Sequence, residues 1–302
     1  MRISSRFDLQ GHRGARGLFP ENTLEGFRAT LGIGVATFEL DVALARDGVA
    51  MVHHDPALNP DIARGPDGRW LDAPTPLLHE LTTEALSRYD VGRLRPGSDY
   101  AARYPEQQPI DGARIPRLAD VLLIDPEVRF NLEMKSDPRQ PGRTAGAEDL
   151  ADAVMAEVDA AGVLARAIVE SFDWRGPRHL RRTRPDVRLA WLTTPDTVEQ
   201  AAVWWDGPHP SDFGGSVPRA VAAEAMGATA PVWAPDHTWV DPEQIEEAHA
   251  LGLEVIPWTV NEPTRMRRLI DWGIDGLITD RPDLARIVMQ EAGLPLPPVR
   301  PG

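Results

Sequence analysis

Two short segments of the chain carry acidic side chains at alternate positions. Glu39 and Asp41 alternate with apolar residues in one, and Glu133 and Lys135 do so in the other. A β-strand has a side-chain period of two, so each polar pair lies on one face of its strand. The strands of a parallel barrel are covered by helices on the outside, which suits the apolar faces. We therefore expect the polar faces to point into a barrel, near the carboxyl ends of its strands.

Three carboxylates that converge in a partly buried space would repel one another and lose hydration, unless a cation offsets both effects. Lys135 offsets one charge, and a divalent cation would satisfy the rest. The chain contains no cysteine, which leaves oxygen and imidazole ligands and favours Mg²⁺ or Ca²⁺. The alternative is a buried ion-pair network of Glu133, Lys135 and Arg13 that only stabilises the fold.

Two histidines fall close to this acidic cluster. His12 and Arg13, flanked by glycines, end the first predicted strand, and His54 follows a later one. Two imidazoles can divide proton transfer, one taking a proton from a nucleophile and the other giving a proton to a leaving oxygen. Arg13 can grip a phosphate as a planar fork, while Lys135 and a metal neutralise the charge of its oxygens.

A hairpin explains how His54 could reach the carboxylates. The dipeptide Asp47-Gly48 is a strong signal for a two-residue turn. That turn would pair Arg46 with Val49 and would place Asp41 opposite His54. Alternation then sends the preceding histidine to the opposite face.

Strand and helix signals alternate along most of the chain, which is typical of a parallel sheet with helical crossovers. The predicted parallel strands are Asp8–His12, Thr37–Val42, Arg129–Lys135, Ala167–Phe172, Val187–Leu192, Ala228–Ala234, Glu254–Thr259 and Gly276–Thr279. The predicted helices are Asn22–Ile33, Ala147–Ala161, Arg175–Arg184, Asp241–Leu251 and Pro263–Trp272. Asn22 and Glu25 resemble the ends of a capping box. Eight such strands predict a closed (β/α)8 TIM barrel.

Recurrent proline and glycine break this pattern between about residues 56 and 116. We interpret this stretch as an insertion that covers the mouth of the barrel, within a single domain spanning residues 1–302. The Pro-rich tail from about residue 294 is expected to be extended and poorly ordered.

The charge balance restricts the partners. The 302 residues include 32 Lys+Arg and 46 Asp+Glu, giving a formal net charge of -14. Such a field repels polyanions, so nucleic acid is not expected as a partner. The first residues lack the apolar region of a signal peptide and no apolar run has the length of a membrane span. We therefore expect a cytoplasmic protein without stable membrane insertion.

With these features in place, the sequence resembles the glycerophosphodiester phosphodiesterase family. The resemblance is carried in order by Gly11–Gly14, Pro20–Thr23, Glu39–Val42, Asp47-Gly48, His54-Asp55, Ile115–Leu118, Asn131–Lys135, Trp258–Asn261 and Asp275–Pro282. It implies a TIM barrel with an insertion after the His-Asp motif. It also implies His12 and His54 as the acid/base pair, Glu39, Asp41 and Glu133 as metal ligands, and Arg13 and Lys135 as phosphate contacts.

Other residues near these motifs have open or minor roles. An aromatic side chain at Trp258 either lines a glycerol or headgroup pocket or packs at the barrel rim. Glu21 either orders Arg13 or favours a helix N-terminus electrostatically, and the second role is expected. Asp55 is expected to be a turn residue.

The predicted reaction is hydrolysis of a small-molecule glycerophosphodiester to an alcohol and sn-glycerol 3-phosphate, with one divalent cation. His12 is provisionally the base and His54 the acid, and the attacking oxygen belongs either to water or to a neighbouring substrate hydroxyl. The nearest rival is a lysophospholipase D or phospholipase D-like enzyme on the same barrel. A non-catalytic phosphate- or sugar-binding barrel and a metal-dependent sugar isomerase or aldolase are more distant alternatives. The sequence does not determine the oligomeric state.

Overall fold

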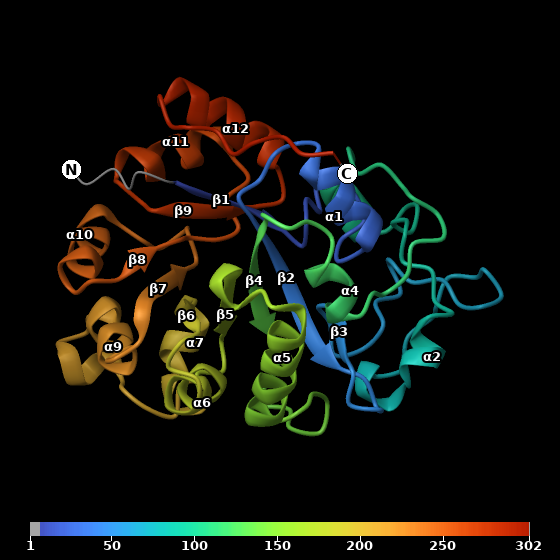
Figure 1. Ribbon diagram of the computed structural model, residues 1–302, viewed down its shortest axis with the longest axis horizontal. Coiled ribbons are helices and arrows are strands. Elements are labelled where there is room, and N and C mark those ends of the chain that lie inside the picture. The colour runs from blue at the N-terminus through green and yellow to red at the C-terminus, as the bar shows by residue number, and fades with distance from the viewer. Residues whose placement is uncertain (1–6, 302) are drawn as a thin grey trace.

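Eight parallel strands form a nearly closed barrel in the computed structural model, which describes residues 7–301 (Figure 1). The strands of the barrel are β1 (Asp8–His12), β2 (Thr37–Leu44), β4 (Arg129–Met134), β5 (Ala167–Ser171), β6 (Arg188–Thr193), β7 (Thr229–Pro235), β8 (Glu254–Val255) and β9 (Gly276–Thr279). The order around the barrel is β8-β7-β6-β5-β4-β2-β1-β9. Backbone bonds from Asp275 to Val255 (3.0 Å) and from Ile278 to Pro257 (3.0 Å) join the β8 segment to β9. The predicted (β/α)8 barrel is confirmed.

Helices surround the strands on the outside of the barrel (Figure 1). The longer ones are α1 (Leu24–Leu31), α5 (Ala147–Ala161), α6 (Arg175–Thr183), α9 (Val217–Glu224), α10 (Pro242–Ala250), α11 (Pro263–Asp271) and α12 (Pro282–Glu291). Short elements are α2 (Thr83–Leu86), α3 (Asp99–Arg103), α4 (Leu118–Leu122), α7 (Pro195–Glu199), α8 (Ala201–Trp204) and the 3₁₀ turns η1 (Leu78–Glu80), η2 (Leu164–Arg166) and η3 (Pro210–Phe213). Among the described residues, no helix is both long and apolar enough to cross a bilayer.

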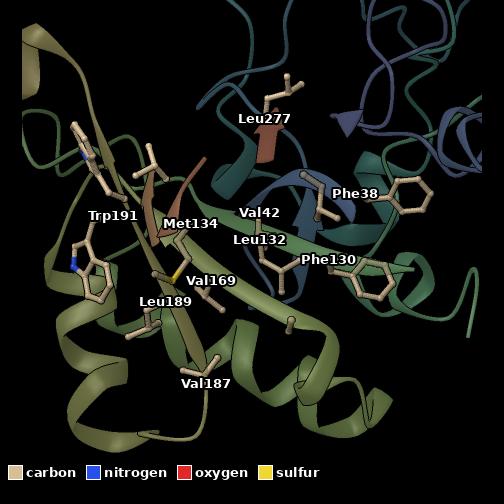
Figure 2. Close-up of a cluster of buried hydrophobic side chains, with 14 of the residues drawn as sticks. Phe38, Val42, Phe130, Leu132, Met134, Val169, Val187, Leu189, Trp191 and Leu277 are labelled. Atoms are coloured by element: carbon tan, nitrogen blue, oxygen red, sulfur yellow. The ribbon is translucent and has the colours of Figure 1, made fainter. Parts of the chain in front are cut away.

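The main hydrophobic core lies between the barrel and its helices. Figure 2 shows the alternate outward residues of several strands packed together, among them Phe38, Phe130, Leu132 and Trp191. Phe38 and Phe130 pair across β2 and β4, with ring centroids 6.4 Å apart. Because these apolar residues face outward, Glu39 and Glu133 on the same strands point into the barrel, as the alternation predicts.

The interior of the barrel is divided between polar and apolar layers. At the amino ends of the strands, the Asp8 carboxylate accepts from Thr37 (2.6 Å) and Arg129 (2.8 Å). Asn131 donates to Gln10 in the same region (2.9 Å). On the other strands, inward-facing residues form a small apolar cluster, which consists of Ile168, Ala190, Val232, Ile256 and Ile278. These layers close the barrel beneath the acidic cluster.

The predicted register of the hairpin between β2 and β3 (Ala50–Val52) is wrong by one residue. The ladder pairs Leu44 with Ala50 and Val42 with Val52, so the turn contains three residues, 46–48, and not two. Gly48 takes the left-handed conformation (φ 76°), as a three-residue hairpin loop requires. The residue that pairs with Asp41 is consequently His53, whose backbone N–H donates to the Asp41 carbonyl (2.9 Å).

Asn22 is not the N-cap of the first helix. That role belongs to Thr23, whose hydroxyl accepts from the backbone of Gly26 (3.0 Å). Asn22 itself has a φ of 54°, which asparagine tolerates better than most residues. The left-handed turn directs the Asn22 amide to Asp41 (2.8 Å), so the residue belongs to the acidic cluster instead.

Residues 56–116 connect the hairpin to α4 and contain only short helical elements (Figure 1). They enclose a second apolar cluster against the hairpin, which contains Met51 of β3 together with Leu58, Leu78 and Ile115. The segment is therefore packed onto the barrel through its own core.

The C-terminal tail forms no helix or strand from residue 294 to residue 301, and polar contacts hold it against α1 and α12. The backbone N–H of Arg300 donates to Leu31 (3.0 Å) and its guanidinium lies 3.5 Å from Glu127. Arg286 of α12 also donates to the carbonyl of Pro297 (2.7 Å). These ion pairs and hydrogen bonds place the tail beside α1.

Candidate active site

The polar residues predicted to carry chemistry meet at the carboxyl ends of the strands. The parallel register pairs His12 with Glu39 and, two residues further along β2, Asp41 with Glu133, which places the two pairs at successive inward positions of adjacent strands. His12, Glu39 and Glu133 line a cavity of about 190 Å³. Its lining is His12, Arg13, Arg16, Glu39, His54, Glu133, Lys135, Glu170, Phe172, Leu192, Trp258, Thr259 and Ile278.

Three carboxylates lie together at this cavity. One oxygen from each of Glu39, Asp41 and Glu133 lies within 4.8 Å of the others, and all three side chains are buried. The Asp41 Oδ1 atom is buried without a hydrogen-bond partner among the described residues. Close carboxylate oxygens with an unsatisfied acceptor are the donor set that Mg²⁺ and Ca²⁺ prefer. The residues therefore fit a divalent cation.

Two cationic side chains compensate part of this negative charge. Lys135 Nζ lies 2.6 Å from Glu133 and 3.5 Å from Asp41. Arg13 Nε lies 3.1 Å from Asp41, and the Arg13 backbone N–H donates to Glu39 (3.0 Å). The ion pairs that a purely structural network would require are therefore present. However, Arg13 and Lys135 supply two positive charges to a cluster of three carboxylates.

The pKa directions of the acidic residues reflect this imbalance. Burial and the neighbouring Asp41 raise the pKa of Glu39 well above its usual range. Burial also raises the pKa of Glu133, against the opposing effect of Lys135. Burial likewise acts to raise the pKa of Asp41, but Arg13 leads the charges that bring it well below its usual range. The protein itself therefore supplies enough positive charge for only part of the cluster.

Glu170 is a fourth buried carboxyl group that the sequence analysis missed. It pairs with Glu133 across β4 and β5 and lines the same cavity. Burial and the charge of Glu133 raise its pKa to about 8, and its Oε2 atom has no hydrogen-bond partner among the described residues. The alternation of β5 could have placed Glu170 inside the barrel, because Ile168 and Glu170 share the inward face of the strand.

His12 is oriented by a carboxylate from the opposite end of the chain. Its Nδ1 atom lies 2.6 Å from Asp280, which directly follows β9. Arg16 donates to both oxygens of that carboxylate (3.0 and 3.1 Å), and Asn261 donates to it as well (2.8 Å). An ionised Asp280 accepts from Nδ1–H, so the Nε2 lone pair of His12 is left free, 3.8 Å from Glu39.

His54 is held in the same manner by its neighbour in the sequence. Its Nδ1 atom lies 2.6 Å from Asp55, and Asn59 donates to the second oxygen of Asp55 (3.0 Å). Asp55 is therefore more than a turn residue. The strand β3 ends at Val52, and the bend that follows brings His54 to the cavity even though the ladder pairs His53 with Asp41.

Both imidazoles favour their neutral forms. Burial lowers the pKa of His54 to about 4, and the nearby charges of Arg13 and Lys135 act in the same direction. Burial also lowers the pKa of His12, although the contact with Asp280 opposes this effect. Neutral imidazoles at neutral pH can accept a proton from a nucleophile.

The loop after β1 fixes Arg13 through its backbone conformation and through a contact to its side chain. Its backbone takes a left-handed conformation (φ 51°), and its Nη1 donates to Glu21 (2.8 Å). Glu21 is buried and bonded to Arg13, so the structure favours the ordering role over the expected electrostatic effect at a helix N-terminus.

Trp258 lies at the rim of the same cavity. Its indole N–H donates to Ala234 (2.9 Å), and its ring meets Phe172 edge to face with centroids 5.3 Å apart. The two rings form an apolar wall opposite the charged residues. All eight residues singled out in the sequence are thus brought together at one cleft, although Asp41 does not line the cavity surface directly.

Comparison with known proteins agrees with these motifs. The model of the glycerophosphoryl diester phosphodiesterase family matches residues 12–284. A glycerophosphodiester phosphodiesterase of Caldanaerobacter subterraneus is 26% identical, with 93% of this chain and 97% of that protein covered.

Solved structures give the same relationship. A putative glycerophosphoryl diester phosphodiesterase from Silicibacter pomeroyi is 35% identical with a TM-score of 0.85, covering 96% of this chain and 95% of the other. An Oleispira antarctica phosphodiesterase, solved in complex with the product sn-glycerol-3-phosphate, shares the fold at 18% identity with a TM-score of 0.66. That alignment covers 94% of this chain and 96% of the other. The chain therefore belongs to the glycerophosphoryl diester phosphodiesterase family, which confirms the family and the enzyme class that the sequence motifs predict.

Proposed function

We propose that this enzyme hydrolyses small glycerophosphodiesters to an alcohol and sn-glycerol 3-phosphate, using one divalent cation and two histidines. One observation carries the proposal: a three-carboxylate cluster and two carboxylate-held imidazoles face a single cavity. The product bound in the Oleispira antarctica relative supports the same substrate class.

The cation is proposed to be Mg²⁺ or Ca²⁺, held by Glu39, Asp41 and Glu133. When bound, it would neutralise charge on the phosphate oxygens and polarise the phosphorus centre. The charges of the side chains support a bound cation, because Arg13 and Lys135 leave part of the carboxylate charge uncompensated.

Arg13 and Lys135 are proposed to bind the non-bridging oxygens of the phosphate. Both line the cavity, and a planar guanidinium can make two parallel bonds to a phosphate group. Trp258 is proposed to contact the glycerol or the headgroup through the apolar wall that it forms with Phe172.

The proton transfers are assigned to the free Nε2 atoms of the two histidines, with His12 as base and His54 as acid. An acid needs a proton at the time of reaction, although burial and charge keep the free imidazole of His54 neutral. The positive neighbours that lower the pKa of His54 are Arg13 and Lys135, which are the proposed phosphate contacts. Substrate binding would offset both charges and favour protonation of His54.

The nucleophile is either water or a neighbouring hydroxyl of the substrate, which would give a cyclic phosphate first. Either nucleophile would lose its proton to His12.

Three further expectations stay predictions from the sequence. They are a cytoplasmic location, a single catalytic domain over residues 1–302 and the absence of nucleic acid among the partners.

The proposed activity predicts that glycerophosphocholine releases glycerol 3-phosphate only when a divalent cation is present. Chelator should abolish release, and Mg²⁺ or Ca²⁺ should restore it. His12→Ala and Glu39→Ala should each lower kcat by roughly 100-fold or more, since each removes a group that acts on the reacting phosphate. Full activity in both variants would contradict the site assignment. Cleavage of lysophospholipids alone would favour the lysophospholipase D alternative.

Asp280→Asn is expected to lower kcat by roughly 100-fold or more with little change in KM. An amide at this position can donate to Nδ1 and so favours the wrong tautomer of His12. Asp275→Asn is the matched control, because Asp275 makes the same kind of contact to His249 (2.9 Å) away from the cavity. Steady-state kinetics check the difference, and a kcat for Asp280→Asn within about threefold of the wild type would refute the orienting role.

The pKa of His54 should rise when sn-glycerol 3-phosphate binds to the cation-loaded enzyme. We expect an increase of about one unit or more, because the phosphate offsets the charges of Arg13 and Lys135, which lower this pKa. Titration of the histidine ring protons by NMR measures the shift, with His249 as the internal reference. An unchanged or lower pKa for His54 would remove the argument for His54 as the acid.

A further inference from the structure

A tyrosine of the 56–116 segment contacts the network that orients Arg13. Tyr100 lies on α3, and its hydroxyl donates to the Oε2 atom of Glu21. The other oxygen of Glu21 accepts from Arg13 Nη1 (2.8 Å). Tyr100, Glu21 and Arg13 therefore form a continuous relay from the insertion to the cavity.

The same hydroxyl lies beside the network that orients His12. Arg16 Nη1 donates to it (3.3 Å) while the rest of the Arg16 guanidinium binds Asp280. Arg16 has several other supports, because Gln107 donates to its backbone carbonyl (2.8 Å) and both Asp280 oxygens accept from its side chain. Loss of the hydroxyl would therefore disturb the Glu21 contact far more than the position of Asp280.

The segment around Tyr100 is fixed against the loop that carries these residues. The backbone N–H of Gln108 donates to Leu18 (2.7 Å), and Arg281 after β9 donates to Glu106 (2.8 Å). Glu21 is buried, so an Oε2 atom without its donor would be a costly unsatisfied acceptor. A rotation of Glu21 to find a new partner would release Arg13.

We propose that Tyr100 is a positioning residue that holds the phosphate-binding conformation of Arg13 through Glu21, so that the insertion determines the affinity for the phosphate group. This inference rests on the proposed function, in which Arg13 contacts the substrate phosphate. Arg13 would bind the phosphate in both the ground state and the transition state. Its misplacement should then raise KM more than it lowers kcat.

The test compares Tyr100→Phe with Tyr104→Phe. Each variant removes one hydroxyl from an aromatic ring of the same segment, and the two rings meet edge to face with centroids 5.2 Å apart, but the hydrogen bond to Glu21 comes from Tyr100. For Tyr100→Phe we expect KM for glycerophosphocholine and the inhibition constant of inorganic phosphate to rise about 5- to 20-fold, with kcat within about threefold. Tyr104→Phe should leave these constants unchanged, because it keeps the ring that lies 4.7 Å from the Arg16 guanidinium.

A double-variant cycle separates the relay from a general structural effect. If Tyr100 acts through Glu21, adding Tyr100→Phe to Glu21→Gln should raise KM by much less than the product of the two single effects. Multiplicative effects would overturn the inference, as would an unchanged KM in Tyr100→Phe while the wild type is active. An inactive wild type would instead refute the proposed function.

Discussion

Repulsion among buried carboxyl groups is the constraint on which the site depends. Strand alternation and the parallel register place four carboxyl groups on adjacent strands around one cavity. Arg13 and Lys135 are the cationic side chains in direct contact with them. An arrangement that costs stability in a folded protein is retained where it has a function. A divalent cation would convert this cost into a binding site for a phosphodiester.

The remaining polar contacts fix the direction of each functional side chain. A carboxylate holds the Nδ1 atom of each histidine, with Asp280 acting on His12 and Asp55 on His54. Each histidine can consequently offer its Nε2 atom to the proposed proton transfers, and both imidazoles favour the neutral form. The insertion adds one more contact of this kind, because the Tyr100 hydroxyl donates to Glu21 in the loop after β1. The barrel thus supplies the positions, and residues outside its strands supply the orientations.

Local patterns in the sequence predicted the barrel and most of the cluster. The alternation around Glu39 and Glu133 follows directly from strand geometry, so their inward direction could be predicted without knowledge of distant contacts. The role of Asp280 could not, because it depends on the contact between the first and last strands. Glu170 was missed because it is the one charged residue of β5, which lacks the alternate polar pair of β2 and β4. The hairpin register was wrong since a three-residue loop also accommodates Asp-Gly, and His54 reaches the cavity through a bend after the strand.

The central claim is that the carboxylate cluster binds one cation. The most direct test is a crystal structure of the enzyme with Mn²⁺ and sn-glycerol 3-phosphate, measured at a wavelength where manganese scatters anomalously. We expect one anomalous peak at the cavity, within about 2.0–2.6 Å of an oxygen from each of Glu39, Asp41 and Glu133. The claim would be contradicted if the cluster showed no anomalous peak at saturating Mn²⁺, or if the peak were bound only by other residues.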